Sequence, residues 1–371
     1  MQLTEVLRAA TSVRAPCYLG PRALLPRAAD RPPPRAMGEQ HPEKARLPTP
    51  LVALLLCGFS VLQAMAAAAS KEGGEYPYKV VASTLLSEVF KIALSALCLA
   101  REVWGAPDAD RRRALYFTTR TLAAAAVPGV AYQVLNNLNF VTLYYVDAPT
   151  FQILGNLKIV ATGLAGRYLL KRKLDTGRWL ALVLLTLGAA SSQVAPDCAG
   201  DGAAFLRLGD RAYGYASAVA CVGLSATMGV FTEAFMKGTR SSIHFQNMQL
   251  YAFGIAANLA ALLYRGEVGA GASPLFAGFN VWGSVATVAN GCCGLAVSFM
   301  LRYADSIAKT YASALTIPAT AAASYACFGT PVGAASALGS GVMLASLAFF
   351  YGGADLFAPP DAGKLPGAAD R

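Results

Sequence analysis

Charged residues and histidines are scarce in this chain of 371 residues. Asp, Glu, Lys and Arg together make up 14% of it, whereas a soluble protein has about 25%. The two histidines, His41 and His244, are too few to build a metal cluster. The sequence has no Cys-x-x-Cys pair, no P-loop, no G-x-S-x-G and no dinucleotide fingerprint. These absences argue against a soluble protein and against an enzyme, and they predict neither a metal nor a cofactor.

Apolar residues dominate instead. The chain is 55% hydrophobic, with a mean hydropathy of +0.45. Lys and Arg outnumber Asp and Glu by 31 to 21. That excess lies in short connections and in the N-terminal tail, and it forms no stripe with interleaved aromatic residues. We therefore expect a lipid bilayer as the surroundings of this protein, and no nucleic acid as its partner.

Ten apolar segments follow Leu51, most of them about 17–25 residues long, which is the length of a membrane-spanning helix. Charged or Gly/Pro-rich connections separate them. We predict an all-α polytopic membrane protein with ten transmembrane helices. They are expected near residues 50–69, 79–101, 117–145, 148–170, 176–193, 212–235, 244–264, 279–301, 306–328 and 333–352.

The ten segments divide into two sets of five. The turn Tyr145-Val146-Asp147 recurs as Tyr303-Ala304-Asp305, 158 residues later and again ahead of the last two segments of its set. Two tandem copies of an odd number of helices must cross the membrane in opposite senses, so they would form inverted repeats with a solute site between them. The predicted organisation is a tail at 1–48, a first five-helix repeat at 49–193, a luminal loop at 194–211, a second five-helix repeat at 212–352 and a cytosolic tail at 353–371.

The tail at 1–48 is rich in arginine, and Pro32-Pro33-Pro34 excludes a continuous helix there. It is either a disordered basic cytosolic tail or a transit-like extension. Most Lys and Arg of the short loops fall on the side of the membrane that holds the N-terminus. Because positive loops are retained in the cytosol, we expect both termini to be cytosolic.

Two lysines, Lys158 and Lys309, lie deep in apolar segments, one in each half. A lysine at the centre of a spanning helix costs about 2.5–3.5 kcal/mol and usually faces a water-filled path or a partner. Phe151 shares a helical face with Lys158, with Gln152 beside it, and Ser313 shares a face with Lys309. We predict that the two ammonium groups hold an anionic solute; the alternative is that each side chain snorkels to an interface.

Amides and a phenol also occur inside the apolar segments. Asn136 and Asn137 lie in the third segment, and Asn247 and Tyr251 lie four residues apart in the seventh. Such groups suit the recognition of a base and a ribose, although they could equally hydrogen-bond one helix to another.

Two acidic residues lie within apolar segments. Glu88 and Lys91, one turn apart, are expected to form a structural ion pair. Glu233 is expected to be a solvated charge at a helix end, within reach of Lys237, and a role in gating is the alternative.

At these residues the chain resembles the pyrimidine nucleotide-sugar transporters of the Golgi, which include carriers of CMP-sialic acid, UDP-galactose and UDP-N-acetylglucosamine. The resemblance covers nearly all of 51–352. Its clearest stretches are Ser87 to Ile92, Asn136-Asn137 with Asp147-Ala148, Phe151-Gln152 through Ile159, Gly229 to Glu233, Asn247 to Tyr251, and Arg302 to Asp305 with Lys309.

The resemblance implies a ten-helix drug/metabolite-transporter fold that exchanges a cytosolic nucleotide sugar for a luminal nucleoside monophosphate. It implies that Lys158 and Lys309 contact phosphate, while Asn137, Asn247 and Tyr251 line the nucleotide pocket. Phe151 departs from the family, which often has a tyrosine there. The Golgi membrane is the expected location, with the endoplasmic reticulum as alternative, and a homodimer is left open. The competing functions are a carrier of another anion, such as a sugar phosphate, and a non-transporting scaffold.

Overall fold

The computed structural model describes residues 49–73, 75–146, 148–193, 212–264, 275–329 and 332–352. Within these ranges the regular secondary structure is α-helical, and no β-strand is present. The tails at 1–48 and 353–371 and the loop at 194–211, all predicted from the sequence, lie outside the described residues. The prediction of an all-α protein is confirmed for the described part.

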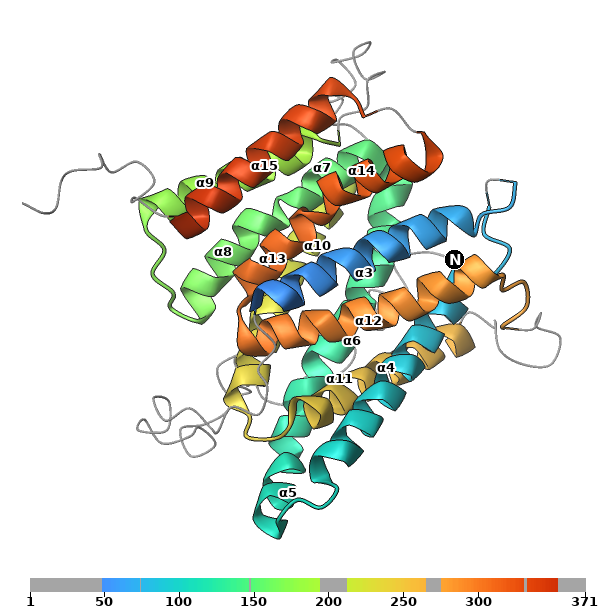
Figure 1. Cartoon of the computed structure of the whole chain (residues 1–371), viewed down its shortest axis with the longest axis vertical. Coiled ribbons are helices and arrows are strands. Elements are labelled where there is room, and N and C mark those ends of the chain that lie inside the picture. The colour runs from blue at the N-terminus through green and yellow to red at the C-terminus, as the bar shows by residue number, and fades with distance from the viewer. Residues whose placement is uncertain are drawn as a thin grey trace, which may run out of the picture.

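The helices follow the predicted segments closely (Figure 1). Those of the first half are α3 (Thr49–Ala69), α4 (Val80–Val103), α5 (Asp108–Ala114), α6 (Thr119–Tyr145), α7 (Ala148–Asn156), α8 (Lys158–Leu169) and α9 (Thr176–Ser191). Those of the second half are α10 (Ala212–Gly238), α11 (Ile243–Tyr264), α12 (Val281–Tyr303), α13 (Ser306–Ala314), α14 (Thr316–Phe328) and α15 (Ala334–Gly352).

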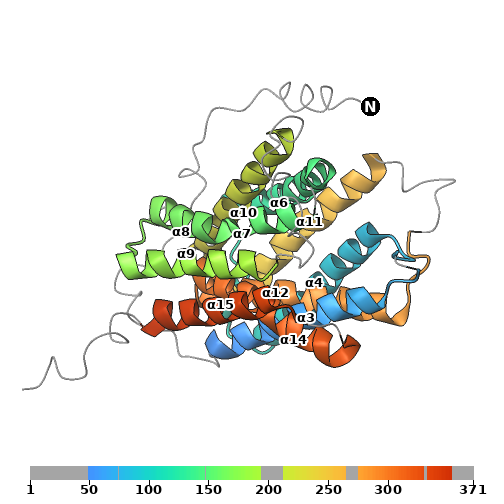
Figure 2. The same cartoon turned by 90° about the horizontal axis from the view of Figure 1, so that it is seen from above.

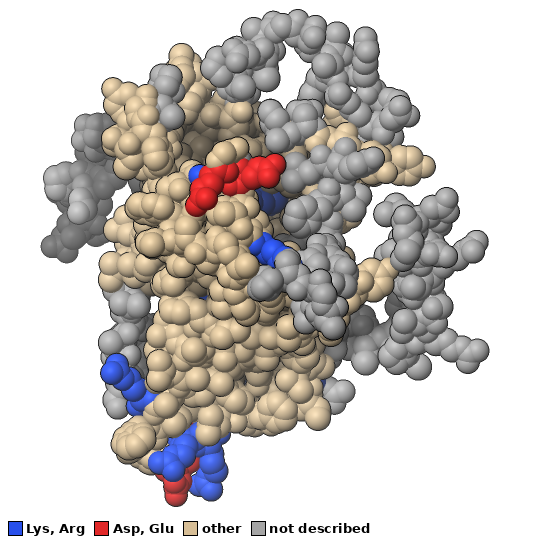
Figure 3. All heavy atoms as spheres, turned by 90° about the vertical axis from the view of Figure 1, so that its right-hand side faces the viewer, with Lys and Arg blue, Asp and Glu red and all other residues tan. Residues whose placement is uncertain are grey.

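Five of these helices are long and apolar enough to cross a membrane: α3, α4, α10, α12 and α15. In Figure 3 the face shown is made mostly of uncharged residues; Lys and Arg gather at its lower end, where α5 carries Arg111, Arg112 and Arg113, and a smaller group of Asp, Glu, Lys and Arg lies in its upper half. A broad uncharged surface on which charge is limited to a few groups is what a protein embedded in lipid presents. The protein is therefore a membrane protein, as its composition predicts.

The two segments that carry the lysines are not the continuous helices that the sequence predicts. The first is interrupted at Leu157, whose N–H donates to the carbonyl of Leu154, 3.0 Å away, in a tight turn. The second is interrupted at Leu315. Pro318 explains the second break, because its ring has no N–H and clashes with the carbonyl of Ala314, the last residue of α13.

The helices recur at a constant spacing along the chain. α7 begins at residue 148 and α13 at 306, α9 begins at 176 and α15 at 334, and α6 ends at 145 and α12 at 303. Each of these pairs is 158 residues apart, and so are the interruptions at Leu157 and Leu315. The recurrence of the Tyr-x-Asp turn in the sequence thus reflects a recurrence of helix boundaries. Asp305 shows why the turn is needed, since its carboxylate accepts a 2.7 Å hydrogen bond from the N–H of Ala308 and caps α13.

The two halves are packed together along their whole length. α3 lies along α12, α9 along α15, α6 along α10 and α4 along α11 (Figure 1 and Figure 2). One apolar cluster joins the lysine-bearing helices to α9 and α15, and it comprises Ile159, Leu182, Leu185, Ala189, Ile307, Tyr311, Ala314 and Met343. Because Ile159 follows Lys158 and Ile307 precedes Lys309 by two residues, this cluster fixes the backbone next to both lysines.

The contact of α9 with α15 depends on two glycines. A Cβ on Gly339 would lie 2.5 Å from the carbonyl oxygen of Gly188, whereas a Cβ on Gly341 would meet nothing within 4 Å. We expect Gly339→Ala to destabilise the fold by about 1–3 kcal/mol, because it forces the helices apart. Gly341→Ala, on the same helix, should be neutral or stabilise by about 0.5–1 kcal/mol. Thermal unfolding of the purified variants in detergent checks this, and equal midpoints for the two would contradict the packing described here.

Candidate functional site

Lys158 and Lys309 line the same cavity, which has a volume of about 260 Å³. The cavity lies between α7 and α8 of the first half and α10, α13 and α14 of the second, and Gln193 beyond the end of α9 also borders it. Hydroxyl groups make up much of its remaining polar lining, and they belong to Thr162, Ser225, Ser306, Thr310, Ser313 and Thr316.

The two ammonium groups in this cavity are not neutralised by the part of the chain that is described. Lys158 is the first residue of α8 and is exposed to the cavity, and Lys309 lies half-buried in the middle of α13. No described carboxylate forms an ion pair with either lysine. Their charges do interact with each other. Two like charges in one cavity of low dielectric produce a strongly positive potential, which favours an anion with more than one negative charge.

Three of the hydroxyl groups around the lysines already donate their protons within the protein. Thr162 donates to the carbonyl of Lys158 at 2.7 Å, Thr310 donates to that of Ser306 at 2.7 Å, and Thr316 donates to that of Ser313 at 2.6 Å. Their oxygens keep lone pairs that can accept further hydrogen bonds. The cavity therefore offers cations toward an anionic group and hydroxyl oxygens toward donors such as alcohols.

The lysines do not occupy equivalent positions in the two halves. At the spacing of 158 residues Lys158 corresponds to Thr316, and Lys309 corresponds to Phe151. Lys158 begins the helix after its interruption, whereas Lys309 lies in the helix before its own. One charge therefore enters the cavity from the helix that follows an interruption, and the other enters it from the helix that precedes one. The sequence alone does not indicate this difference.

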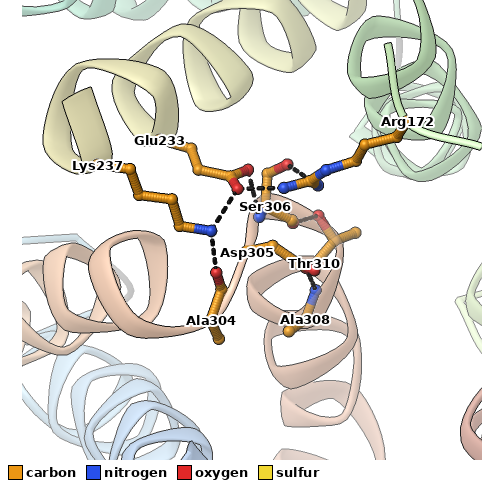
Figure 4. A network of polar contacts seen from close by, with 8 residues as sticks. All are labelled: Arg172, Glu233, Lys237, Ala304, Asp305, Ser306, Ala308 and Thr310. Atoms are coloured by element: carbon orange, nitrogen blue, oxygen red, sulfur yellow. Dashed lines mark hydrogen bonds and ion pairs between the residues drawn. The ribbon is translucent and has the colours of Figure 1, made fainter. Parts of the chain in front are cut away.

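A network of charged residues adjoins the cavity at Ser306 (Figure 4). Glu233 of α10 accepts hydrogen bonds from Lys237 at 2.7 Å, from Arg172 in the connection between α8 and α9, and from the backbone N–H of Ser306 at 2.9 Å. Lys237 also donates to the carbonyl of Ala304. Ser306 belongs both to this network and to the cavity lining.

The side chain of Glu233 is 1% exposed. The predicted pairing with Lys237 is confirmed, but the predicted solvated charge is wrong. Glu233 is buried because Arg172 and the turn between α12 and α13 fold over it. The network ties three separate segments of the chain together next to the cavity.

A second polar cluster lies between α4, α11 and α12. Lys91 forms the predicted ion pair with Glu88, with 2.6 Å between Nζ and Oε1. The same ammonium lies 4.2 Å from the centre of the Tyr251 ring, and the hydroxyl of Tyr251 lies 2.9 Å from that of Ser298. Asn247 is fully buried, and neither its Oδ1 nor its Nδ2 has a hydrogen-bond partner among the described residues.

The structure brings together three of the residues selected from the sequence, Lys158, Lys309 and Ser313. It does not place the others in the cavity. Phe151 is half-buried and Gln152 exposed on α7, and Asn247 and Tyr251 belong to the second polar cluster. The backbones of Asn136 and Asn137 lie in α6, and their side chains are outside the described part.

Sequence reasoning missed Asn156, Gln193 and Ser225 as cavity residues. A signal for Asn156 exists, because it is an amide two residues before a lysine inside an apolar segment. Gln193 has a weaker signal, because it is the last residue of the predicted segment 176–193 and borders the predicted polar loop.

Comparison with known proteins decides the family. The sequence model of the family described as "Nucleotide-sugar transporter" matches residues 49–352. The chain belongs to this family. The chain is 34% identical to CMP-sialic acid transporter 1 of Oryza sativa subsp. japonica over 307 residues, which cover 81% of this chain and 93% of that protein. It is equally similar, at 34% identity, to CMP-sialic acid transporter 1 of Arabidopsis thaliana, over 85% of this chain and 92% of that one.

Other relatives agree. The UDP-galactose translocator of Mus musculus is 35% identical over 224 residues, which cover 60% of this chain and 56% of that protein. A solved crystal structure superposes with a TM-score of 0.60 over 85% of this chain and 98% of its own, at 14% sequence identity. That likeness is one of fold. The resemblance described from the sequence is therefore confirmed at the level of the family, and this member of the family places two lysines in one cavity.

Proposed function

We propose that this protein is an antiporter of the Golgi membrane that imports a pyrimidine nucleotide sugar, either a UDP-sugar or a CMP-sugar, in exchange for the nucleoside monophosphate. The observation that carries the proposal is the cavity with two ammonium groups that no described carboxylate neutralises. A nucleotide sugar carries one or two phosphate groups, which a pair of ammonium groups would hold. Family membership and relatives that are named for CMP-sialic acid and UDP-galactose support the same substrate class.

In this proposal Lys158 and Lys309 bind the phosphates from opposite sides, with Ser313 beside them. The nucleoside occupies the region of Asn247 and Tyr251, together with Asn136, Asn137, Phe151 and Gln152. The unpartnered amide of Asn247 supports this assignment, because a buried amide without hydrogen bonds is costly unless a ligand satisfies it. The cavity of about 260 Å³ is smaller than the ~300–1,000 Å³ of typical small-molecule sites. Binding of a whole nucleotide sugar would therefore require α11 to move relative to the lysines.

We further propose ten membrane spans arranged as two inverted five-helix repeats. In this assignment α7 and α8 form one span, α13 and α14 form another, and α5 lies outside the membrane. The spacing of 158 residues between corresponding helices supports it. The packing supports it as well. In the two repeats α3 corresponds to α10 and α6 corresponds to α12, and the contact of α3 with α12 is matched by the contact of α10 with α6. Two further contacts, α4 with α11 and α9 with α15, each join a helix to its own counterpart. Exchange would then be a rocking of the two halves about the cavity.

The Glu233 network would close the cavity on the cytosolic side. By the distribution of Lys and Arg, the connection that carries Arg172 and the turn between α12 and α13 are cytosolic, and both chain termini lie on that side. Opening toward the cytosol would separate Glu233 from Arg172 and from Ser306. No metal and no ATP enter this scheme, because the counter-transported monophosphate supplies the driving gradient.

Proteoliposomes test the proposed function. The purified protein is reconstituted, the vesicles are preloaded with UMP or CMP, and uptake is measured for a panel of radiolabelled nucleotide sugars. We expect one of the two monophosphates to accelerate uptake of at least one nucleotide sugar, and free monophosphate outside to compete with it. Uptake that no preloaded nucleotide accelerates would contradict exchange, and competition by sugar phosphates alone would indicate a carrier of another anion.

A further inference from the structure

Two residues that line the cavity each carry a buried amide atom without a hydrogen-bond partner in the described part of the chain. Asn156 is 8% exposed, and its Nδ2 makes no hydrogen bond. The Oε1 of Gln193 is likewise buried and makes none. Both residues line the cavity that holds the lysines. They contribute one free donor and one free acceptor, and buried polar groups left in this way call for an explanation.

The hydrogen-bonding chemistry of Asn156 and Gln193 excludes some parts of a nucleotide sugar as their ligand. A phosphate oxygen can only accept hydrogen bonds, so it cannot satisfy the Oε1 of Gln193, which is itself an acceptor. A pyrimidine base is usually bound by stacking on an aromatic ring, but none of the described residues that line this cavity is aromatic. A hydroxyl group both donates and accepts. An amide donor, an amide acceptor and the nearby hydroxyl oxygens of Thr162 and Ser225 therefore match a polyhydroxylated ring.

The positions of Asn156 and Gln193 also agree with a polyhydroxylated ring as their ligand. Asn156 precedes Lys158 by two residues, and both border the same cavity, so a group bonded to a phosphate held by Lys158 would lie next to Asn156. Asn247 and Tyr251 lie outside the cavity lining, between α4, α11 and α12. A nucleotide sugar has its base and its glycosyl group on opposite sides of the phosphates, and the polar cluster of Asn247 and Tyr251 is separate from the cavity that Asn156 and Gln193 line.

We propose that Asn156 and Gln193 form the subsite that binds the hydroxyl groups of the glycosyl moiety, and that they determine which sugar is carried. This inference rests on the proposed function and specifies the half of the substrate that the proposed function leaves open. The subsite makes no contact with the nucleoside, so it discriminates nucleotide sugars from one another and not one base from another.

The test compares the whole nucleotide sugar with its nucleoside monophosphate, which lacks the glycosyl group. Competition by the preferred nucleotide sugar and by its nucleoside monophosphate is measured against labelled substrate in proteoliposomes, for the wild type, Asn156→Ala and Gln193→Ala. We expect each variant to lose about three- to ten-fold in apparent affinity for the nucleotide sugar, which corresponds to one neutral hydrogen bond. The apparent affinity for the monophosphate should change by less than about two-fold.

Controls separate the subsite from general damage. Thr176→Ala alters an exposed residue at the other end of α9 and should change neither affinity. Asn156→Gln and Gln193→Asn keep the amide group and serve if an alanine variant does not fold. Equal losses for both ligands, or no loss for the nucleotide sugar, would overturn the subsite. A wild type without saturable binding of any nucleotide sugar would instead overturn the proposed function, and the subsite with it.

Discussion

Lys158→Ala and Lys309→Ala are each expected to lower nucleotide-sugar exchange by on the order of 100-fold. Removal of one ammonium leaves the phosphate charges in a low-dielectric cavity with only one cation. Truncating one partner of such a buried charge pair costs about 2–5 kcal/mol, and 100-fold corresponds to about 2.8 kcal/mol. The measurement is the initial rate of exchange in proteoliposomes that contain equal amounts of folded protein.

Lys173→Ala is the matched control for these variants. Lys173 carries the same charge but is exposed in the connection between α8 and α9. It should retain wild-type exchange, which would show that loss of a positive charge as such is not the cause. Lys309→Arg keeps the charge but replaces a compact ammonium with a planar guanidinium, so we expect it to recover only part of the activity. Wild-type exchange in either alanine variant would remove that lysine from the mechanism.

Glu233→Ala is expected to destabilise the folded protein by about 3–5 kcal/mol. The carboxylate is buried, and its removal leaves the charges of Arg172 and Lys237 and the N–H of Ser306 without their partner. Thermal unfolding in detergent, followed by intrinsic fluorescence, measures the effect as a lowered midpoint.

The chain offers a matched control for this prediction. Asp175 and Arg178 also form an ion pair, with 3.5 Å between the charged atoms, but their side chains are 68% and 52% exposed. Exposed pairs contribute little to stability, so Asp175→Ala should change it by less than about 1 kcal/mol. Equal lowering of the midpoint by Glu233→Ala and Asp175→Ala would contradict the claim that the ion pairs of Glu233 are buried and stabilise the fold.

Helix positions followed well from the sequence because apolar length is a direct signal in a membrane protein. The segment expected at 176–193 is Thr176–Ser191, and the one expected at 244–264 is Ile243–Tyr264. The interruptions at Leu157 and Leu315 did not follow, because the apolar run continues through both of them. Pro318 was visible, but a proline near a helix start is tolerated, so it does not by itself indicate that a new helix begins just before it.

The site was predictable only in part, because several of its residues meet partners that are far away in the sequence. Lysines in apolar segments are conspicuous, and the structure places both in one cavity. Burial of Glu233 was not predictable, because its partner Arg172 lies 61 residues away in another connection. Gln193 enters the cavity only because α9 packs against α7, α8 and α13, and no local pattern records that arrangement. Local patterns show which residues are costly to bury, and the packing of the halves decides which of them meet.

An experimental structure with a pyrimidine nucleotide sugar bound tests the central claim most directly. The account predicts that phosphate oxygens lie about 2.7–3.2 Å from the Nζ atoms of both Lys158 and Lys309, inside the cavity between the two halves. A bound nucleotide sugar whose phosphates contact neither lysine, or only one of them, would contradict it.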